Sequence, residues 1–404
     1  MIKRERYIQR IRPFIGTELI KVLTGIRRSG KSVMLELIKE ELREQGISDT
    51  QFITFNFESL ANAKYCTSDA LYKELDKRVS DISEKSYLFF DEIQEVDGWE
   101  KCINSARMDF DCDIYITGSN AKLLSGELAT YLGGRYVEFL IYPFSFEEYL
   151  ECRKQDQTLL SIPDEFKNYI DLGGMPFLTN LYGDRTASLQ YLRDLYNSVI
   201  LKDVVKRNNI RDVDLLERII TYVLANVGHT FSARGISNYF KSENRRVAPE
   251  TILNYIKACC DAYLFFKLSR EDIAGKKILS VNEKYYIVDH GIREAVYGGT
   301  TRNMDQLLEN IVCMELIRRG YTVTIGKVMD KEVDFVAQSG NEKIYVQVAY
   351  LLSSQDTVER EFRAYDAIRD NYPKYVISMD DYDMSRDGIK HRNIRDFLLA
   401  EKWD

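Results

Sequence analysis

One short string constrains this chain more than any other. Residues 25–32 read GIRRSGKS and match the pattern GxxxxGK[ST] in full, between an apolar run at 19–23 and a helix-patterned run at 33–42. A glycine-rich turn between a strand and a helix lets successive backbone N–H groups converge on an anion, and the helix adds its positive dipole end. The string therefore predicts a phosphate-binding loop for ATP rather than an ordinary glycine turn.

The motif also assigns roles to side chains. Lys31 is expected to reach the outer phosphates, and the Ser32 hydroxyl is expected to ligate Mg²⁺. The other predicted nucleotide contacts come from the loop and the first helical turn: Gly25, Arg27, Arg28, Ser29, Gly30 and Val33. ATP and Mg²⁺ are thus the predicted ligands.

A second strand carries acidic residues that suit such a site. Residues 87–90 form an unbroken apolar run, typical of a strand buried on both faces of a parallel sheet, and Asp91 and Glu92 follow it. Because ligands bind at the carboxyl ends of strands in open α/β sheets, Asp91 is predicted to hold Mg²⁺ and Glu92 to orient or deprotonate the attacking water. The alternative is an Asp-Glu turn after a core strand, which the upstream loop disfavours.

Two more strand ends supply candidate contacts. A strand at 113–117 leads into Asn120, whose amide is predicted to sense the γ-phosphate. Arg135 precedes a strand at 137–140 and is a candidate arginine finger for a neighbouring subunit's site, in competition with Arg27 and Arg28 for phosphate contacts. Ordinary strand-end chemistry is the alternative for both residues.

Together these motifs resemble the prokaryotic AAA-type ATPases of the archaeal-ATPase branch. The resemblance rests on 23–32, Asp91-Glu92, 117–120 and 142–149, in about the first third of the chain. From residue 173 (GGMP) onward the chain is similar to the domain of unknown function often fused to that ATPase, which ends in a restriction-endonuclease-like fold. The resemblance implies a P-loop ATPase with a DNA-linked role and a homo-oligomer, although members of this branch need not form a ring. It fixes no substrate.

The predicted fold class is α/β: a P-loop NTPase with a parallel sheet, then a helical and winged-helix region and a restriction-endonuclease-like α/β domain. A chain of 404 residues exceeds one hydrophobic core, and 45% apolar with 29% charged residues is typical of globular proteins. The predicted domains are an AAA-type P-loop ATPase domain at 1–155, a helical connector at 156–211, a winged-helix domain at 212–299 and a nuclease-like domain at 300–404.

Composition limits location and partners. The N-terminus lacks an apolar leader and no run is long enough to span a bilayer, which predicts a cytoplasmic protein with no membrane partner. The seven cysteines include no CxxC pair and the three histidines are dispersed, which disfavours a zinc site. A net charge of −7 argues against a surface coated with phosphate-binding residues, while local patches can still bind.

The segment 212–299 follows the order of a winged helix-turn-helix. A helix-patterned run at 215–224 precedes a short helix capped by Ser232, a helix at 249–263 and strands at 264–268 and 285–288. In DNA-binding versions, basic residues at the second helix and in the wing meet phosphates. The candidate contacts with double-stranded DNA are Arg245, Arg246, Lys276 and Lys277. The alternative is a module used only for domain packing, since the recognition helix carries few basic residues.

The last segment combines a nuclease-like layout with missing chemistry. Glu309 on a helix and Asp334 and Gln347 on later strands follow the order of PD-(D/E)XK nucleases, whose carboxylates hold Mg²⁺ and whose lysine stabilises the attacking water. Ala349 stands where that lysine belongs. Losing such a cationic group costs about two to three orders of magnitude in rate, so we predict a degenerate site without cleavage, unless Lys343 or Lys331 substitutes.

Three functions follow for the whole chain. The first is a Mg²⁺-dependent ATPase that couples nucleotide state to a DNA-linked assembly through its C-terminal domains. The second is an ATP-gated binding switch, and the third is an ATP-regulated nuclease. Glu92 favours the first, because a pure binding switch does not require a catalytic acid.

Overall fold

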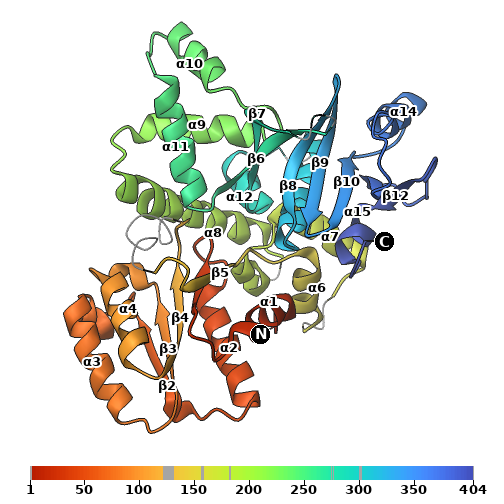
Figure 1. Ribbon diagram of the computed structural model, residues 1–404. Helices are drawn as coiled ribbons and strands as arrows, with labels where there is room; N and C mark the ends of the chain where they lie inside the picture. Colours follow the sequence, from red (N-terminus) through yellow and green to blue (C-terminus); the bar gives the residue numbers. More distant parts are fainter. Residues whose placement is uncertain are drawn as a thin grey trace. The chain divides into compact units, whose positions relative to one another are not determined.

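The computed structural model of the 404-residue chain describes residues 2–121, 132–155, 159–181, 183–273, 275, 277–299 and 303–403, with the backbone alone at 277–282 (Figure 1). The chain forms two compact units. The first comprises Met1–Pro143 with Asp261–Tyr263, and the second comprises Phe144–Cys260 with Leu264–Asp404. Each unit contains its own sheet, so the two are described in turn.

The first unit is built on a five-stranded, fully parallel sheet in the order β2-β3-β4-β1-β5. Its strands are β1 Ile20–Thr24, β2 Phe52–Asn56, β3 Ser86–Asp91, β4 Cys112–Gly118 and β5 Tyr136–Leu140. Every residue of β1 and β3 is buried, which explains why both are largely apolar. The exception inside β1 is Lys21, whose ammonium pairs with the buried Asp113 of β4. The helices α1 Glu5–Ile11, α2 Lys31–Glu44, α3 Ser68–Ser80 and α4 Trp99–Asp109 accompany this sheet (Figure 1).

Strand order brings the functional strand ends together. β4 lies between β1 and β3, and all three run in the same direction. The loop after β1, the acidic pair after β3 and the polar turn after β4 therefore share one edge of the sheet. The core below them is aromatic, with Phe55, Phe57 and Phe90 stacked at ring-centroid distances of 5.9 to 6.4 Å.

The second unit begins with helices. They are α6 Phe146–Lys154, α7 Ile162–Leu172, α8 Arg185–Ser198, α9 Val213–Ala225, α10 Ala233–Ser242 and α11 Pro249–Asp261, and a π-helical turn, η7 Val199–Lys206, extends α8. α6 opens with a capping box between Ser145 and Glu148 and buries Phe146 and Leu150 in the core of this unit. That apolar face explains why residues 146–154, which the sequence places with the ATPase domain, pack with the second unit.

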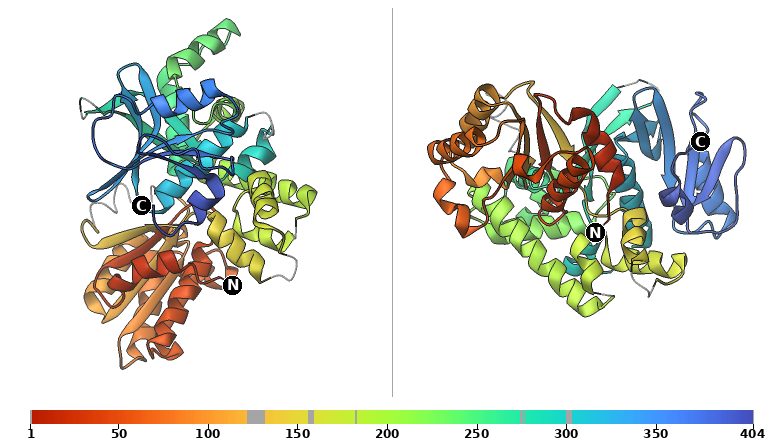
Figure 2. Two further views of the ribbon diagram at one scale, coloured as in Figure 1. Left: turned by 90° about the vertical axis from the view of Figure 1, so that its right-hand side faces the viewer. Right: turned by 90° about the horizontal axis from the view of Figure 1, so that it is seen from below.

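A seven-stranded mixed sheet completes the second unit, in the order β12-β11-β10-β9-β8-β6-β7. Its strands are β6 Phe265–Asp272, β7 Lys277–Ile287, β8 Thr322–Val328, β9 Lys331–Ser339, β10 Glu342–Val348, β11 Lys374–Ser378 and β12 Ile389–Asn393. The remaining helices are α12 His290–Val296, α13 Met304–Arg318, α14 Gln355–Arg363 and α15 Ile394–Leu399. α13 packs against this sheet through Leu308, Val312 and Leu316. Figure 2 shows the ribbon of the chain from two further sides.

The two predicted wing strands are part of this larger sheet. β6 and β7 pair antiparallel, as a wing does, but β6 also pairs with β8 in parallel through residues 270–272 and 325–327. A single sheet therefore contains strands from both segments that the sequence assigns to winged-helix and nuclease-like domains. The α/β fold class, with a parallel P-loop sheet followed by a mixed-sheet region, is confirmed. In the part of the chain that the structure describes, no helix is long and apolar enough to cross a membrane.

Short helical turns connect these elements. They are η1 Arg12–Phe14, η2 Asp49–Gln51, η3 Leu60–Tyr65, η4 Ile93–Glu95 and η6 Pro176–Leu181. The GGMP turn before η6 is tightly packed within the second unit, because a Cβ on Gly174 would lie 2.2 Å from the carbonyl oxygen of Phe144. Asp289 holds the same turn by accepting the Gly174 N–H at 2.7 Å.

Candidate functional site

The loop between β1 and α2 has the conformation that its glycines allow. Gly25 (φ +139°) and Gly30 (φ +99°) both adopt positive φ, and a Cβ on Gly25 would lie 2.2 Å from the carbonyl oxygen of Ile141. Arg28 also has a left-handed backbone (φ +67°). The loop curls tightly before α2 begins at Lys31, which leaves the first N–H groups of that helix without helical acceptors.

Lys31 is held inside this loop by neutral acceptors. Its ammonium nitrogen donates to the carbonyl oxygens of Gly25 at 3.1 Å and Ile26 at 3.2 Å, and Lys31 is only 4% exposed. The Oε1 atom of Glu92 lies 3.8 Å from the same nitrogen, beyond hydrogen-bonding distance. Lys31 is thus fixed at the loop by two main-chain carbonyls, with the Glu92 carboxylate as its ionic neighbour.

The two predicted metal ligands, Ser32 and Asp91, lie at the same edge of the sheet. The Asp91 carboxylate accepts the Thr117 hydroxyl at 2.6 Å and the Asn56 amide at 3.1 Å. Burial raises the pKa of Asp91, and the hydroxyls of Thr117 and Ser32 oppose that rise. A carboxylate and a hydroxyl at this edge of the sheet are suitable oxygen ligands for Mg²⁺.

Glu92 is held in an unusual backbone conformation. Its φ is +54°, which costs a residue other than glycine about 1–3 kcal/mol, and it is only 8% exposed. Its N–H donates to the Thr117 hydroxyl at 2.9 Å, and the Gln94 amide donates to its carboxylate. Thr117 therefore holds both acidic residues: its O–H donates to the Asp91 carboxylate, and its oxygen accepts the Glu92 N–H.

The other predicted residues lie at different distances from this centre. Asn120 is fully buried after β4, the strand between β1 and β3. Arg27 donates to Glu58 at 2.8 Å, whereas Arg28 and Val33 are exposed. Arg135 precedes β5 and donates to Asn104 at 3.3 Å; because β5 is parallel to β1, Arg135 lies at the opposite edge of the sheet from the loop. The structure does not bring Arg135 to this chain's own site.

Sequence reasoning missed three supporting residues. Asn56 ends β2 and Thr117 lies in β4, so polar residues at the ends of strands were a signal for both. Arg4 contacts the loop from the N-terminal segment, and no motif marks it. Within the first unit, Tyr263 (φ +57°) also donates to Glu138 at 3.1 Å.

The second sheet brings together the predicted nuclease-like residues around a lysine that the sequence did not single out. Lys284 of β7 is 4% exposed, and its ammonium nitrogen lies 3.3 Å from Glu309 and 2.8 Å from Glu332. Burial opposes its charge, but Glu309, Asp334 and Glu332 hold the pKa of Lys284 above its usual value. We call Lys284, Glu309, Glu332 and Asp334 the Lys284 cluster.

Asp334 and Gln347 extend this cluster into a cavity of about 570 Å³. Asp334 accepts the Val348 N–H at 2.9 Å, and burial, then the nearby Glu309, raise its pKa well above the usual value. Gln347 donates to Glu361 at 3.0 Å. Among the described residues, no three carboxylate, histidine or cysteine side chains form a group that could hold a metal ion.

The two lysines expected to compensate for Ala349 have other partners. Lys343 pairs with Glu271 at 3.3 Å and Lys331 pairs with Asp366 at 3.2 Å. Neither pair includes a member of the Lys284 cluster, whose carboxylates pair instead with Lys284 of β7 and, at Glu332, also with Arg270 of β6.

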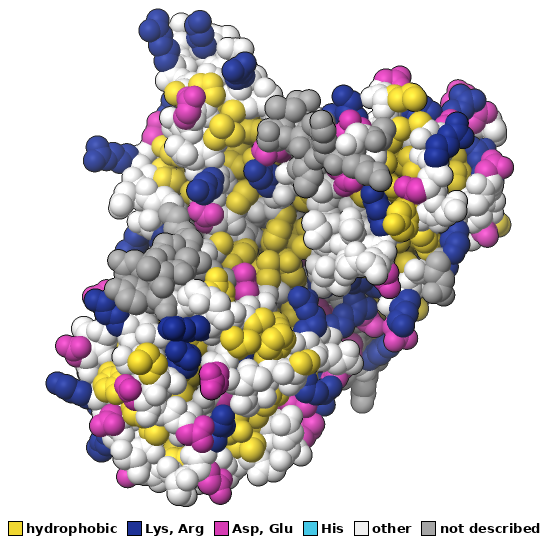
Figure 3. Space-filling model, viewed as in Figure 1, with side chains coloured by type: hydrophobic (Ala, Val, Ile, Leu, Met, Phe, Trp, Pro, Cys, Tyr) yellow, Lys and Arg dark blue, Asp and Glu magenta, His cyan; other side chains and the backbone are white. Residues whose placement is uncertain are grey.

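Of the four predicted DNA contacts, one is paired within the protein, one is exposed and two have side chains that are not described. Arg245 donates to Asp212 at 2.6 Å and Asp214 at 2.7 Å, so its charge is largely neutralised within the unit. Arg246 is exposed. Lys276 lies outside the described residues, and of Lys277 only the backbone, at the start of β7, is described. Lys and Arg side chains gather at the α10 end of this unit (Figure 3).

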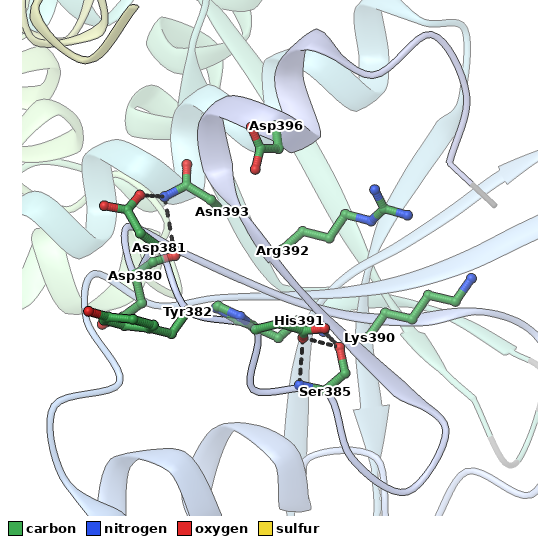
Figure 4. A pocket seen from close by; sticks show the side chains of 10 residues that line it. Asp380, Asp381, Tyr382, Ser385, Lys390, His391, Arg392, Asn393 and Asp396 are labelled. Atoms are coloured by element: carbon green, nitrogen blue, oxygen red, sulfur yellow. Dashed lines mark hydrogen bonds between the residues drawn. The ribbon is translucent and has the colours of Figure 1, made fainter.

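Asp380 and His391 line a cavity of about 430 Å³ beside β12 (Figure 4), and Ser378, which is not one of its lining residues, contacts both. His391 accepts the Met384 N–H on Nδ1 at 3.3 Å, so Nε2 carries the proton and donates to the Ser378 oxygen at 2.9 Å. Ser378 in turn donates to Asp380 at 2.8 Å. A histidine that donates to the serine cannot take its proton, so this arrangement is not a catalytic triad.

Two family models match parts of this chain, and two known proteins are similar to most of it. Residues 17–150 match a family model described as an AAA domain, and residues 163–303 match one described as a domain of unknown function. The chain is 39% identical over 400 residues to an uncharacterised protein of Haemophilus influenzae, covering 99% of each. It is 34% identical over 370 residues to one of Methanocaldococcus jannaschii, covering 87% of this chain and 79% of that one.

A solved structure shows the same fold. The Walker-type ATPase of Pyrococcus abyssi aligns with a TM-score of 0.50 at 15% identity, covering 73% of this chain and 95% of that one. The first unit therefore has the fold of that P-loop ATPase and matches the AAA-domain model over residues 17–150. The whole chain belongs to the family that includes the Haemophilus influenzae and Methanocaldococcus jannaschii proteins.

Proposed function

We propose that the protein is a Mg²⁺-dependent ATPase in which Glu92 activates water and the second unit couples nucleotide state to double-stranded DNA. The observation that carries the proposal is the buried Asp91, which accepts the Thr117 hydroxyl and the Asn56 amide, directly before the buried Glu92. A carboxylate that would hold Mg²⁺ together with the Ser32 hydroxyl thus adjoins a carboxylate suited to accept a proton, at the end of a loop suited to phosphates.

Each residue has a separate task in this proposal. Lys31 and the free N–H groups at the start of α2 bind the outer phosphates, and Asn120 orients the terminal one. Mg²⁺, when bound by Ser32 and Asp91, would neutralise negative charge on the phosphates. Glu92 accepts the proton of the attacking water, and its strained backbone and Gln94 fix the direction of its carboxylate.

Glu92→Gln tests the catalytic assignment. The amide keeps the size of the side chain but cannot accept the proton, so turnover should fall about 10²- to 10⁴-fold while ATP affinity persists. Steady-state phosphate release and titration calorimetry measure the two quantities. Glu95→Gln is the matched control, because Glu95 is an exposed carboxylate three residues further on. Unchanged turnover in Glu92→Gln would remove Glu92 from catalysis.

The absolute rate separates an ATPase that does mechanical work from a switch. Turnover on the order of one per second, stimulated by DNA, fits a remodelling ATPase, whereas turnover per minute or slower fits an ATP-gated binding switch. Arg135 is assigned to a neighbouring copy's site, because it is exposed at the far edge of its own sheet. Mass measurement with a non-hydrolysable ATP analogue tests that homo-oligomer.

The α9–α11 region is the proposed DNA contact, although its predicted residues change. Arg246, Arg234 and Lys241 are exposed around α10, whereas Arg245 is paired with two aspartates. Gel retardation of linear DNA should weaken steeply with salt, since phosphate contacts release counterions. Arg246→Ala should lower affinity for every sequence and reduce the salt slope by about one. Arg245→Ala should change it less, and the reverse order would contradict this assignment.

The same DNA should remain intact. Lys284 already balances the cluster that a nuclease would use for metal, and Lys343 and Lys331 have other partners. Supercoiled DNA incubated with the protein, ATP and Mg²⁺ or Mn²⁺ should show no nicking over an hour. Nicking that Asp334→Ala abolishes would instead support an ATP-regulated nuclease.

A further inference from the structure

Arg4 connects the N-terminal segment to the phosphate-binding loop. It is 3% exposed, and its guanidinium donates to the carbonyl oxygens of Ser29 at 3.0 Å and Tyr142 at 2.8 Å. The ring of Tyr7 lies 4.5 Å from the guanidinium carbon, and the Tyr7 hydroxyl accepts the Tyr142 N–H at 3.2 Å. The side chain therefore bridges the loop and the segment that follows β5, behind the site described above.

The contact with Ser29 fixes the orientation of one peptide group. In a trans peptide the C=O and the following N–H point in opposite directions. Because Arg4 holds the Ser29 oxygen on its own side, the N–H of Gly30 must point to the other side of the loop. Gly30 directly precedes α2, so this N–H adjoins the free N–H groups at the start of that helix.

Arg4 is held in place at a cost. Its backbone is left-handed (φ +48°), which costs a residue other than glycine about 1–3 kcal/mol, and its carbonyl accepts the Tyr7 N–H at 2.9 Å. A buried guanidinium also keeps its positive charge at any physiological pH. The surrounding structure thus retains both a strained backbone and a permanent cation next to the loop.

We propose that Arg4 is a positioning residue for phosphate binding: it holds the Ser29–Gly30 peptide so that the Gly30 N–H faces the phosphates. Arg4 itself does not contact the nucleotide. This inference rests on the proposed function only in that the loop binds ATP. It predicts that Arg4 acts on the phosphate part of the ligand and not on the base.

Three variants and two probes test this role. Titration calorimetry with Mg²⁺ measures the affinities for ATP and for inorganic tripolyphosphate, which has no base. Arg4→Met should weaken both by the same factor, about ten- to a hundredfold, the usual effect of losing a hydrogen bond from a charged group. Arg4→Lys should lose less, since an ammonium keeps the charge and can reach one carbonyl. Arg10→Met, an exposed arginine on the same α1 helix, should change neither affinity.

The outcomes separate this inference from simpler roles. Weaker ATP binding with unchanged tripolyphosphate binding would mean that Arg4 supports the base, and would overturn the proposal. Equal affinities in Arg4→Met and the unaltered protein would overturn it too. If Arg4→Met fails to fold, a proportional loss for both probes in folded Arg4→Lys still supports it, and no loss overturns it. Absence of ATP binding in the unaltered protein would instead refute the proposed function.

Discussion

Two lysines of this chain have the same burial and opposite surroundings. Lys31 in the phosphate-binding loop and Lys284 in the second sheet are each 4% exposed. The ammonium of Lys31 donates to two main-chain carbonyls and lies 3.8 Å from one carboxylate, that of Glu92, whereas the ammonium of Lys284 lies within 3.3 Å of two carboxylates. Neutral acceptors fix a lysine without cancelling its charge, while carboxylates cancel it. Surroundings, more than residue type or burial, decide whether a buried lysine can bind an anion.

The backbone reinforces this difference. Lys31 is the first residue of α2, where free N–H groups and the helix dipole add positive potential. Lys284 lies within a strand of a sheet, where backbone groups are paired and add little net dipole. The first site attracts an anion from outside, and the second is already balanced by its own charges.

The largest expected effect is on nucleotide affinity. Lys31→Met removes the only lysine of the loop and should lower ATP affinity on the order of a hundredfold, without a matching loss of stability. Lys284→Met is the comparison variant and should leave the affinity unchanged, since its charge is balanced internally. Titration calorimetry measures both. Equal losses in the two variants would break the comparison.

The next effect is on stability and has the opposite order. Lys284→Met leaves Glu309 and Asp334 without their nearby cation, while Glu332 keeps Arg270. Breaking a buried ion pair in this way costs about 3–5 kcal/mol of unfolding free energy. Urea denaturation should show the loss, and adding Glu309→Gln should recover part of it. Lys267→Met is the control, because Lys267 pairs with Glu283 at 2.9 Å on the surface and should change stability by less than about 1 kcal/mol.

If Lys284→Met is as stable as the unaltered protein, the cluster is balanced by something other than Lys284. Binding of Mn²⁺ to the unaltered protein, lost in Asp334→Asn, would point to a metal ion. Either result would remove the distinction between an open and a balanced site.

The loop could be predicted from sequence because its chemistry is local. The glycines, Lys31 and Ser32 lie within one string, and the unbroken apolar run before Asp91 is enough to indicate a buried parallel strand. The contacts that hold Asp91 and Glu92, by contrast, depend on strand order. Thr117 reaches both residues because β4 lies beside β3.

The Lys284 cluster and the role of Arg245 could not be predicted in this way. Lys284 meets Glu309 and Glu332 through contacts between distant elements, and no local pattern reports them. The sequence shows that Arg245 is basic. It does not show that Asp212, the N-cap of α9, and Asp214, in the first turn of α9, accept its hydrogen bonds. Likewise, the pairing of β6 with β8 depends on long-range register, so the wing strands looked like an independent hairpin.

The smallest expected effect is a pH dependence of the unfolding free energy. It shows whether ionised Asp334 destabilises the Lys284 cluster through its burial or stabilises it through its charge. Burial raises the pKa of Asp334, so in the intermediate pH range the native state binds more protons than the unfolded state. Stability from this group is therefore greatest at low pH and falls as the pH rises from the ordinary carboxyl range toward the raised value. Asp334→Asn, which can still accept the Val348 N–H, should remove that fall, a difference on the order of 1 kcal/mol.

Urea midpoints at a series of pH values measure the difference between Asp334→Asn and the unaltered protein. Asp383→Asn is a control of opposite sign, because hydrogen bonds from Ser385 lower the pKa of Asp383 and confine its effect to acidic pH. If Asp334→Asn instead becomes less stable than the unaltered protein as the pH rises, the charge of ionised Asp334 stabilises the cluster by more than the burial of that charge destabilises it. Lys284 would then hold excess positive charge, and the second site would resemble the first more closely than its contacts indicate.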